Sequence, residues 1–379
     1  MKFTCFMKIA MIIEAWKPIW AGGQIHVWNL CENLIKNHKC KIDLFVMNLD
    51  GKKVEIHFNG KLRIYKIGKK TNFSFKSRLK WLKNVYFVVK SFYNKEKYDL
   101  IHAHANIPGT VAKTLSRKLK IPCVYTIHGN GLNAIKDMYG SGLKSSFIYF
   151  IENYLHTKIK YSHEITVDSS LLKWKNVNKE ISVIPNGVDI VKYDSVKSVK
   201  SNKFKSIFVG RLHPQKGLRY LIKAVSLIKN KLKNEEFHII GKGEEENFLK
   251  DLAEELGVSK FFKFRGAIYG EDLIKEYKSA HLFILPSLYE GQPLTLLEAW
   301  AAKLPVIVTD VGGNKDFVNK GNGYILKSKN SLKLSRIILS AIRNKNLSKL
   351  GLNGYELVKA NYTWDKVADK TFDVYEGLF

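Results

Sequence analysis

Short apolar runs alternate with amphipathic stretches along most of the chain. The apolar runs have the length of buried strands, roughly four to eight residues, and the amphipathic stretches place apolar residues at helical spacing. Strands or extended segments are predicted at residues 8–13, 41–47, 98–104, 122–128, 164–170, 181–189, 205–210, 236–243, 261–268 and 305–309, with a weaker β segment at 54–67. Helices are predicted at residues 26–37, 73–97, 108–119, 217–229, 244–256 and 271–279, and from Pro293 onward.

This alternation repeats as two series, separated where the apolar periodicity lapses between Val188 and Lys203. Strands and helices that alternate through short connections are typical of a parallel sheet with helices on both faces. A chain of 379 residues is also too long for a single core. The pattern therefore predicts two α/β domains, each with a doubly wound parallel sheet.

The charge is strongly positive and unevenly distributed. The chain has a formal net charge of +29, and residues 1–200 contain 34 Lys and Arg against 14 Asp and Glu. Such a field favours anionic partners, which include membrane surfaces, phosphorylated lipids, acidic glycans and nucleic acid. The alternative is a lysine-rich chain whose charges only solvate its surface.

The four cysteines and the opening segment bear on location. Cys5, Cys31, Cys40 and Cys123 form no CxxC pair and no dense framework, which favours a reducing cytoplasm. No apolar stretch is long enough to cross a bilayer. The opening segment has no cleavage site for a signal peptide and is better explained by a first strand, so a cytoplasmic protein is expected.

The stretch from Leu285 to Gly313 combines a strand end, a Gly/Pro turn, a helix and a second strand. Pro293 suits the first helical position. The free amides of Leu294 and Thr295, together with the helix dipole, would then form a seat for phosphate beside Gly291. Glu290 precedes this seat and Glu298 lies about 7 Å further along the helix. The alternative is two exposed glutamates on an amphipathic helix.

Two cations occupy the turn after the first strand of the second series. Arg211 and Lys216 would neutralise the charge that grows on a departing diphosphate. Ordinary surface cations are the alternative. One unit later, backbone groups near Ile268 are placed to contact a nucleobase edge, although this segment is also consistent with a plain loop.

In the first series, Gly22 and Gly23 follow the first strand and His128 follows a later one. Glycine lets the backbone approach a phosphate closely, but the pair is equally explained by a turn that needs positive φ. His128 is placed to hydrogen-bond a sugar hydroxyl, or simply to pack in a loop. His102 and His104 share one side of a strand; no third ligand is evident, so no metal site is predicted.

Together, these segments resemble the retaining glycosyltransferases of family 4. The resemblance rests on the ordered set GGQIHVWNL, YDLIHAH, YTIHG, VIPNGVD, VGRLHPQKG, IIGKGE, LPSLYEGQPLTLLEAWA and PVIVTDVGG, over about residues 8–325. It implies the GT-B fold, two Rossmann-like domains that face each other across a deep cleft. The implied domains are an acceptor-binding domain at 1–190, a nucleotide-sugar-binding domain at 191–362, and a C-terminal helix at 363–379 that returns to the first domain.

The resemblance also implies roles for individual residues. Glu290 and Glu298 match the ends of the E-x7-E motif, and Arg211 and Lys216 match the cations that bind the donor diphosphate. Gly23 matches a glycine that touches the donor phosphates, and His128 matches a histidine on the acceptor side. Three departures, Gln292-Pro293, Lys303 and Asp316, leave the identity of the sugar open.

The expected activity is metal-independent transfer of a hexose, with retention of configuration, from a donor such as a UDP- or GDP-sugar. No cofactor is expected, and the acceptor is expected to be a glycan or a lipid-linked glycan. Residues 73–97 interleave Lys and Arg with aromatic residues and would suit an anionic membrane surface; the alternative is a helix packed on the sheet. A GT-B sugar-nucleotide epimerase and a basic nucleic-acid-binding protein are the other functions considered, although no nucleic-acid-binding motif is present.

Overall fold

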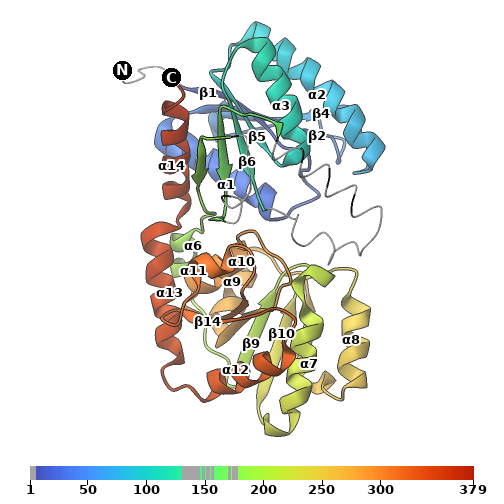
Figure 1. Cartoon of the computed structure of the whole chain (residues 1–379), viewed down its shortest axis with the longest axis vertical. Coiled ribbons are helices and arrows are strands. Elements are labelled where there is room, and N and C mark those ends of the chain that lie inside the picture. The colour runs from blue at the N-terminus through green and yellow to red at the C-terminus, as the bar shows by residue number, and fades with distance from the viewer. Residues whose placement is uncertain are drawn as a thin grey trace. The chain divides into compact units, whose positions relative to one another are not determined.

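The computed structural model describes residues 6–129, 158–169 and 178–379, together with residues 146, 150, 154 and 172 singly. The sequence also predicts a glycine-rich loop after His128 and a helical piece before Ile181, and both lie largely outside these residues. Contacts divide the described chain into two units. Unit 1 runs to Asn186 and includes Trp364–Phe379, and unit 2 contains Gly187–Thr363. Figure 1 shows both units with many of their elements labelled.

Unit 1 is built on an eight-stranded sheet in the order β3-β4-β2-β1-β5-β6-β7-β8. Its strands are β1 (Lys8–Ile12), β2 (Lys41–Met47), β3 (Val54–His57), β4 (Leu62–Ile67), β5 (Leu100–His104), β6 (Cys123–Ile127), β7 (His163–Thr166) and β8 (Ile181–Val183). Ile9 of β1 pairs in parallel with Ile42 on one side and Leu100 on the other. All pairings are parallel except β3 with β4, so the weak β segment is an antiparallel hairpin at the sheet edge.

The helices of unit 1 bury apolar stripes against this sheet. Those that the structure describes in full are α1 (Gly22–His38), α2 (Phe75–Lys95), α3 (Asn106–Leu119) and α14 (Trp364–Glu376). Trp81, Val85 and Val89 form the buried stripe of α2. The C-terminal helix α14 packs along α1, as the red and blue helices of Figure 1 show.

Unit 2 contains a six-stranded sheet in the order β11-β10-β9-β12-β13-β14. The strands are β9 (Phe204–Val209), β10 (Glu235–Ile240), β11 (Phe262–Gly266), β12 (Leu282–Leu285), β13 (Val306–Thr309) and β14 (Gly323–Leu326), all parallel. The α-helices are α6 (Ile190–Ser195), α7 (Leu218–Ile228), α8 (Glu246–Glu255), α9 (Gly270–Ser279), α10 (Leu294–Ala301), α11 (Asn314–Phe317), α12 (Ser331–Arg343) and α13 (Leu347–Asn361). β12 and β13 are fully buried, as expected for strands covered on both faces.

In each sheet, the direction in which successive strands are added reverses at one point. Doubly wound folds bind their ligands at this switch point. In unit 2 the chain winds outward from β9 to β11 and then returns to place β12 on the other side of β9. In unit 1 the corresponding point lies between β1 and β5. The loops at the carboxyl ends of these strands carry the residues described next.

Candidate functional site

The two loops that flank the switch point of unit 2 carry an ion pair. Lys216 ends a short 3-10 turn after β9, and Glu290 lies in the loop after β12. The Lys216 Nζ donates to Glu290 Oε1 at 2.6 Å, and the Ser287 hydroxyl donates to the same oxygen at 2.6 Å. Glu290 is only 5% exposed, so its carboxylate is held in one place by two charge-assisted hydrogen bonds. The structure thus brings together two of the predicted site residues.

Backbone contacts fasten these two loops to each other. The Leu288 amide donates to the Gln215 carbonyl at 2.7 Å, and the Gln215 side chain donates to the Tyr289 carbonyl at 3.0 Å. Gly312, with φ +50, supports the loop from the β13 side, because a Cβ there would lie 1.7 Å from the Glu290 carbonyl oxygen. Only glycine fits this position without moving Glu290.

Helix α10 begins one residue later than predicted. Pro293 is the N-cap, with extended backbone, and Leu294 is the first helical residue. The reason is local: the Leu296 amide closes the first turn on the Pro293 carbonyl, which is the role of an N-cap residue. The amides of Leu294 and Thr295 have no carbonyl one turn earlier in the helix. Amides in this position at the start of a helix favour an anion.

Glu298 lies one turn further along α10 and is held by a tyrosine. The hydroxyl of Tyr277, on α9, donates to Glu298 Oε2 at 2.9 Å. Tyr277 is fully buried, and burial together with the neighbouring carboxylate raises its pKa well above the ordinary value, so it remains a donor. Burial also raises the pKa of Glu298. The sequence analysis missed Tyr277, since nothing in its spacing relates α9 to α10.

Arg211 and Ile268 complete the predicted set in unit 2. Arg211 is exposed and follows β9, and the half-buried Ile268 lies between β11 and α9. Both therefore lie at the carboxyl edge of the sheet, as do Glu290 and Lys216. The contact between the predicted cations and acids is made by Lys216, while Arg211 remains directed to solvent.

In unit 1 the structure places Gly23 against His128. A Cβ on Gly23 would lie 3.7 Å from the imidazole Cδ2 of His128. Gly22 and Gly23 are the first residues of α1 and do not adopt positive φ, so the turn that was the alternative explanation is not what the structure uses. A Cβ at residue 23 would make only an ordinary van der Waals contact, so the fold itself does not require glycine there.

His128, which is half-buried, belongs to a group with the buried His26 and His104. His104 Nδ1 and His128 Nε2 are 3.1 Å apart and share a hydrogen bond. The ring of His26, on α1, lies 4.7 Å from that of His128, and His26 Nδ1 is 2.8 Å from Asn186 Oδ1. Burial lowers the pKa of His26 to about 4, and burial together with the neighbouring histidines lowers the pKa of His104 and His128 well below 6.5. All three are therefore neutral at pH 7.

His26 was missed by the sequence analysis, although a signal was present. It lies three residues after Gly23 on α1, so both occupy one face of the helix. The sequence analysis found no third ligand beside His102 and His104; the structure places His26 and His128, rather than His102, within reach of one another and of His104. His102 itself is engaged by the hydroxyls of Tyr375 and Thr126, at 2.5 and 2.7 Å.

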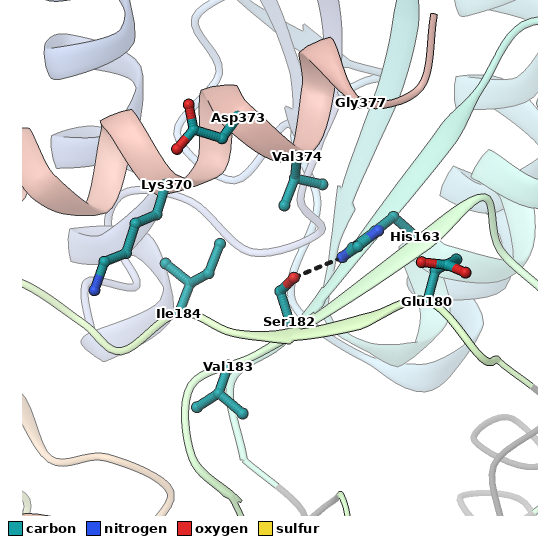
Figure 2. A pocket seen from close by; sticks show the side chains of 9 residues that line it. All are labelled: His163, Glu180, Ser182, Val183, Ile184, Lys370, Asp373, Val374 and Gly377. Carbon is teal, nitrogen blue, oxygen red and sulfur yellow. Dashed lines mark hydrogen bonds between the residues drawn. The ribbon is translucent and has the colours of Figure 1, made fainter.

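An open groove of about 500 Å³ lies elsewhere in unit 1, between β8 and α14 (Figure 2). His163 Nε2 and the Ser182 hydroxyl are 2.8 Å apart on its floor, and Lys370 and Asp373 of α14 lie on the other side. None of the predicted site residues lines it. Its size alone does not make it the reaction site.

Comparison with known proteins shows the family of this chain. The model of Glycosyltransferase Family 4 matches residues 20–192, and that of Glycosyl transferases group 1 matches residues 191–356. An uncharacterized glycosyltransferase of Methanocaldococcus jannaschii is 30% identical, with 98% of each chain covered. This chain belongs to glycosyltransferase family 4. This family 4 glycosyltransferase carries Glu290 and Glu298 on the module between β12 and β13.

Two further relatives of this glycosyltransferase are informative. The UDP-Gal:alpha-D-GlcNAc-diphosphoundecaprenol alpha-1,3-galactosyltransferase of Escherichia coli is 29% identical over 80% of this chain and 81% of its own. The solved structure of sucrose-phosphate synthase from Thermosynechococcus elongatus matches with a TM-score of 0.85 at 21% identity, covering 98% and 99% of the two chains. The predicted GT-B type of fold is thereby confirmed.

The described part of this glycosyltransferase contains no helix that is both long and apolar enough to cross a bilayer.

Proposed function

We propose that this glycosyltransferase moves a hexose from a nucleoside-diphosphate donor to a hydroxyl acceptor, with retention of configuration and without a metal ion. One observation supports this most directly. The Lys216–Glu290 pair lies at the switch point of unit 2, immediately before the amino end of α10. That place brings together a cation from the loop after β9 with two carboxylates and the first amides of α10 from the segment after β12.

Each residue of the proposed donor site has a proposed role. The amides of Leu294 and Thr295, with Gly291 beside them, receive the diphosphate, and Lys216 and Arg211 neutralise it. Glu298, already held on one oxygen by Tyr277, accepts the ribose hydroxyls. The backbone near Ile268 faces the base.

The proposed transfer step breaks the bond between the anomeric carbon and the diphosphate oxygen. Negative charge grows on the departing diphosphate, where the cations and helix amides stabilise it. Positive charge grows on the sugar ring, and Glu290 compensates it. The acceptor oxygen bonds to the anomeric carbon from the leaving-group side, and its proton passes to the departing phosphate oxygen.

Unit 1 is proposed to bind the acceptor. Gly23 leaves the face of His128 open, and the bond to His104 engages Nε2 of that ring, which leaves Nδ1 for a substrate hydroxyl. Because the His128 imidazole is neutral at pH 7, its proposed role is a hydrogen bond to that hydroxyl rather than proton donation from an imidazolium.

A lipid-linked glycan acceptor at the cytoplasmic face of a membrane is the proposed setting. Phe75, Leu79 and Phe87 are 68%, 50% and 56% exposed and recur on one face of α2 at multiples of four residues. Lys76, Lys80 and Lys83 are exposed among them. By contrast, Trp81 and Val85, predicted as part of this surface, are buried and pack on the sheet. The E. coli relative, by its name, acts on a diphosphoundecaprenol substrate.

A donor screen tests the proposal. Purified protein is incubated with UDP-, GDP- and ADP-sugars, and release of the nucleoside diphosphate is measured with and without a chelator. We expect slow release from one donor class, insensitive to the chelator, and loss of more than about 100-fold in Glu290→Gln. Exposed Glu271→Gln is the control. Conversion of the sugar without release of the nucleotide would indicate the epimerase instead.

A further inference from the structure

Three imidazoles from separate elements of unit 1 converge around one point. His26 comes from α1, His104 from the end of β5, and His128 from the residue after β6. One ring nitrogen from each lies within 4.8 Å of the other two. The ligands of a tetrahedral zinc ion with bonds of about 2.0–2.1 Å are about 3.4 Å apart, so shifts of about 1 Å would bring the three rings to that geometry.

A hydrogen bond fixes the His26 ring in the tautomer that can coordinate a metal ion. Asn186 Oδ1 can only accept, so the proton of neutral His26 is on Nδ1, which lies 2.8 Å away. The Nε2 of His26 therefore carries a lone pair. A partner that orients the distal nitrogen in this way is the usual support of a metal-binding histidine.

The nitrogen atoms of the other two rings have fewer hydrogen-bond partners than they can accommodate. His104 Nδ1 and His128 Nε2 are 3.1 Å apart, and one proton serves both atoms. The buried Nε2 of His104 has no hydrogen-bond partner among the described residues. An unpartnered buried nitrogen costs free energy, and a bound cation that reorganises the group removes part of this cost.

We infer that His26, His104 and His128 form a binding site for a divalent transition-metal ion of the class that prefers imidazole, with Zn²⁺ as its representative. Cu²⁺ and Ni²⁺ belong to the same class, whereas Mg²⁺ and Ca²⁺ prefer oxygen ligands. A water molecule would supply the fourth ligand.

The ion would bind apart from the proposed acceptor contact. It would hold His128 through Nε2, the nitrogen that faces His104, whereas the proposed contact with the acceptor hydroxyl uses Nδ1. The metal thus has no part in the transfer step. The site itself does not rest on the proposed function, because binding is measured without turnover.

The test is a titration of the full chain, prepared without a polyhistidine tag, with ZnCl₂ by isothermal calorimetry. We expect one tight equivalent of Zn²⁺. His104→Asn and His26→Gln should each weaken it by more than about 10-fold, and Asn186→Ala, which leaves all three ligands in place, by about 10-fold. His163 is half-buried and lies in the same unit but outside the group. The variant His163→Asn should therefore bind Zn²⁺ as the original protein does.

A second measurement uses only the unaltered protein, so it tests the inference even where a variant fails to fold. Anomalous diffraction at the zinc edge, from zinc-soaked crystals of the unaltered protein, should show a peak among the three rings. No tight equivalent, equal binding by all variants, or a peak at other residues would overturn the inference and leave the histidines as a hydrogen-bonded cluster.

Discussion

Tyr277 and Glu298 show how a single hydroxyl can position a carboxylate that we propose binds the donor. The tyrosine takes one carboxylate oxygen at 2.9 Å inside the protein, so Glu298 presents its other lone pairs in a fixed direction. We expect Tyr277→Phe to raise the donor KM about 10-fold, since a hydrogen bond to a charged group contributes about 1.5–3 kcal/mol. The kcat should change much less, because Glu298 does not touch the reacting bond.

Initial rates over a range of donor concentrations check this prediction. Tyr355→Phe is a matched control, because Tyr355 also donates to a carboxylate of unit 2, Asp194, at 2.7 Å. An equal rise in KM for both variants would mean that Tyr277 acts only through general stability. The same experiment with a 2′-deoxyribose donor should show a smaller penalty in Tyr277→Phe.

At the scale of elements, the loop after β12 is shaped by contact with the loop after β13. Gly312→Ala would press a methyl group onto the Glu290 carbonyl, 1.7 Å away, and displace the loop. A displacement of about 1 Å near the reacting centre can cost about 100-fold in rate, and we expect a loss of kcat/KM of that size.

The variant Gly270→Ala is a control that separates the effect of displacing the Glu290 loop from the effect of backbone strain. Gly270 has φ +62, similar to the φ +50 of Gly312, but its added Cβ would meet no atom within 4 Å. Both variants should therefore lose about 1–3 kcal/mol of unfolding free energy from strain, measured by urea denaturation. Only Gly312→Ala should lose activity; similar kcat/KM values in the two would contradict this explanation.

The elements show what the sequence can and cannot predict. Strands such as β12 and β13 were predictable because each is a short apolar run next to a Gly/Pro turn. The ends of helices were harder to predict than the strands. For example, α10 starts at Leu294 because Pro293 caps it. Contacts between distant segments, such as Tyr277 with Glu298 or His26 with His128, depend on how helices dock, and no local pattern contains that information.

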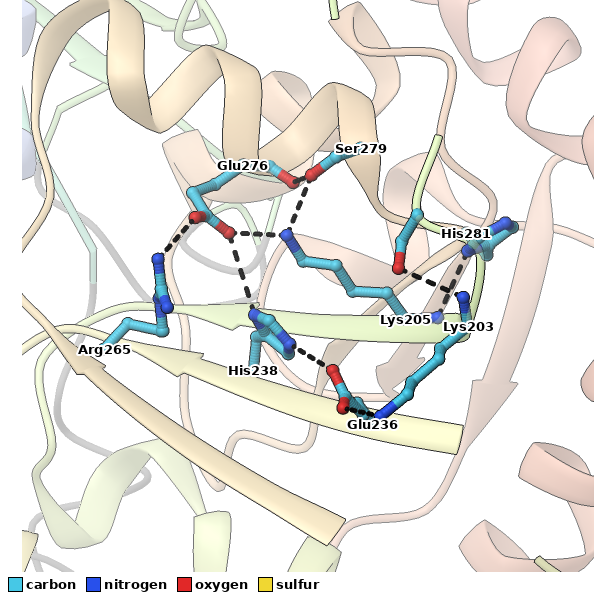
Figure 3. A network of polar contacts seen from close by, with 9 residues as sticks. Lys203, Lys205, Glu236, His238, Arg265, Glu276, Ser279 and His281 are labelled. Carbon is cyan, nitrogen blue, oxygen red and sulfur yellow. Dashed lines mark hydrogen bonds and ion pairs between the residues drawn. The ribbon is translucent and has the colours of Figure 1, made fainter. Parts of the chain in front are cut away.

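At the scale of the whole molecule, charge is not only on the surface. Figure 3 shows a network in unit 2 in which Glu276 contacts Lys205 at 2.6 Å, Arg265 at 3.3 Å and His238 at 3.8 Å. The contact with His238, followed by that with Lys205, lowers the pKa of Glu276 to about 2. Contacts with Lys203 and His238 lower the pKa of Glu236 to about 2 as well.

These lowered pKa values predict acid sensitivity. A carboxyl group whose pKa falls on folding stabilises the native state above its unfolded pKa, near 4.5, and loses this contribution as the pH falls toward 2. Glu276→Gln should therefore lower the unfolding free energy by about 2 kcal/mol at pH 7 and by less at pH 3. Urea denaturation at both pH values checks this; Glu271→Gln, on the exposed face of α9, should change little at either.

The net charge of +29 gives the molecule a further testable property. We expect flotation with vesicles that contain anionic lipid and not with zwitterionic vesicles, and weaker binding at high salt. Replacing Phe75, Leu79 and Phe87 by Ser should reduce binding at least about 10-fold, because each apolar side chain contributes about 1.5–3 kcal/mol when buried. The exposed Leu227 and Leu332 of unit 2, replaced likewise, serve as the control. Equal binding to both vesicle types, or an unchanged triple variant, would rule out this surface.

The central claim is that a nucleoside diphosphate binds at the amino end of α10. A crystal structure of the protein soaked with the nucleotide released in the donor screen tests it most directly. The account predicts the β-phosphate against the amides of Leu294 and Thr295, with Lys216 beside it and the ribose hydroxyls on Glu298. Nucleotide bound elsewhere, with these four residues unoccupied, would contradict it.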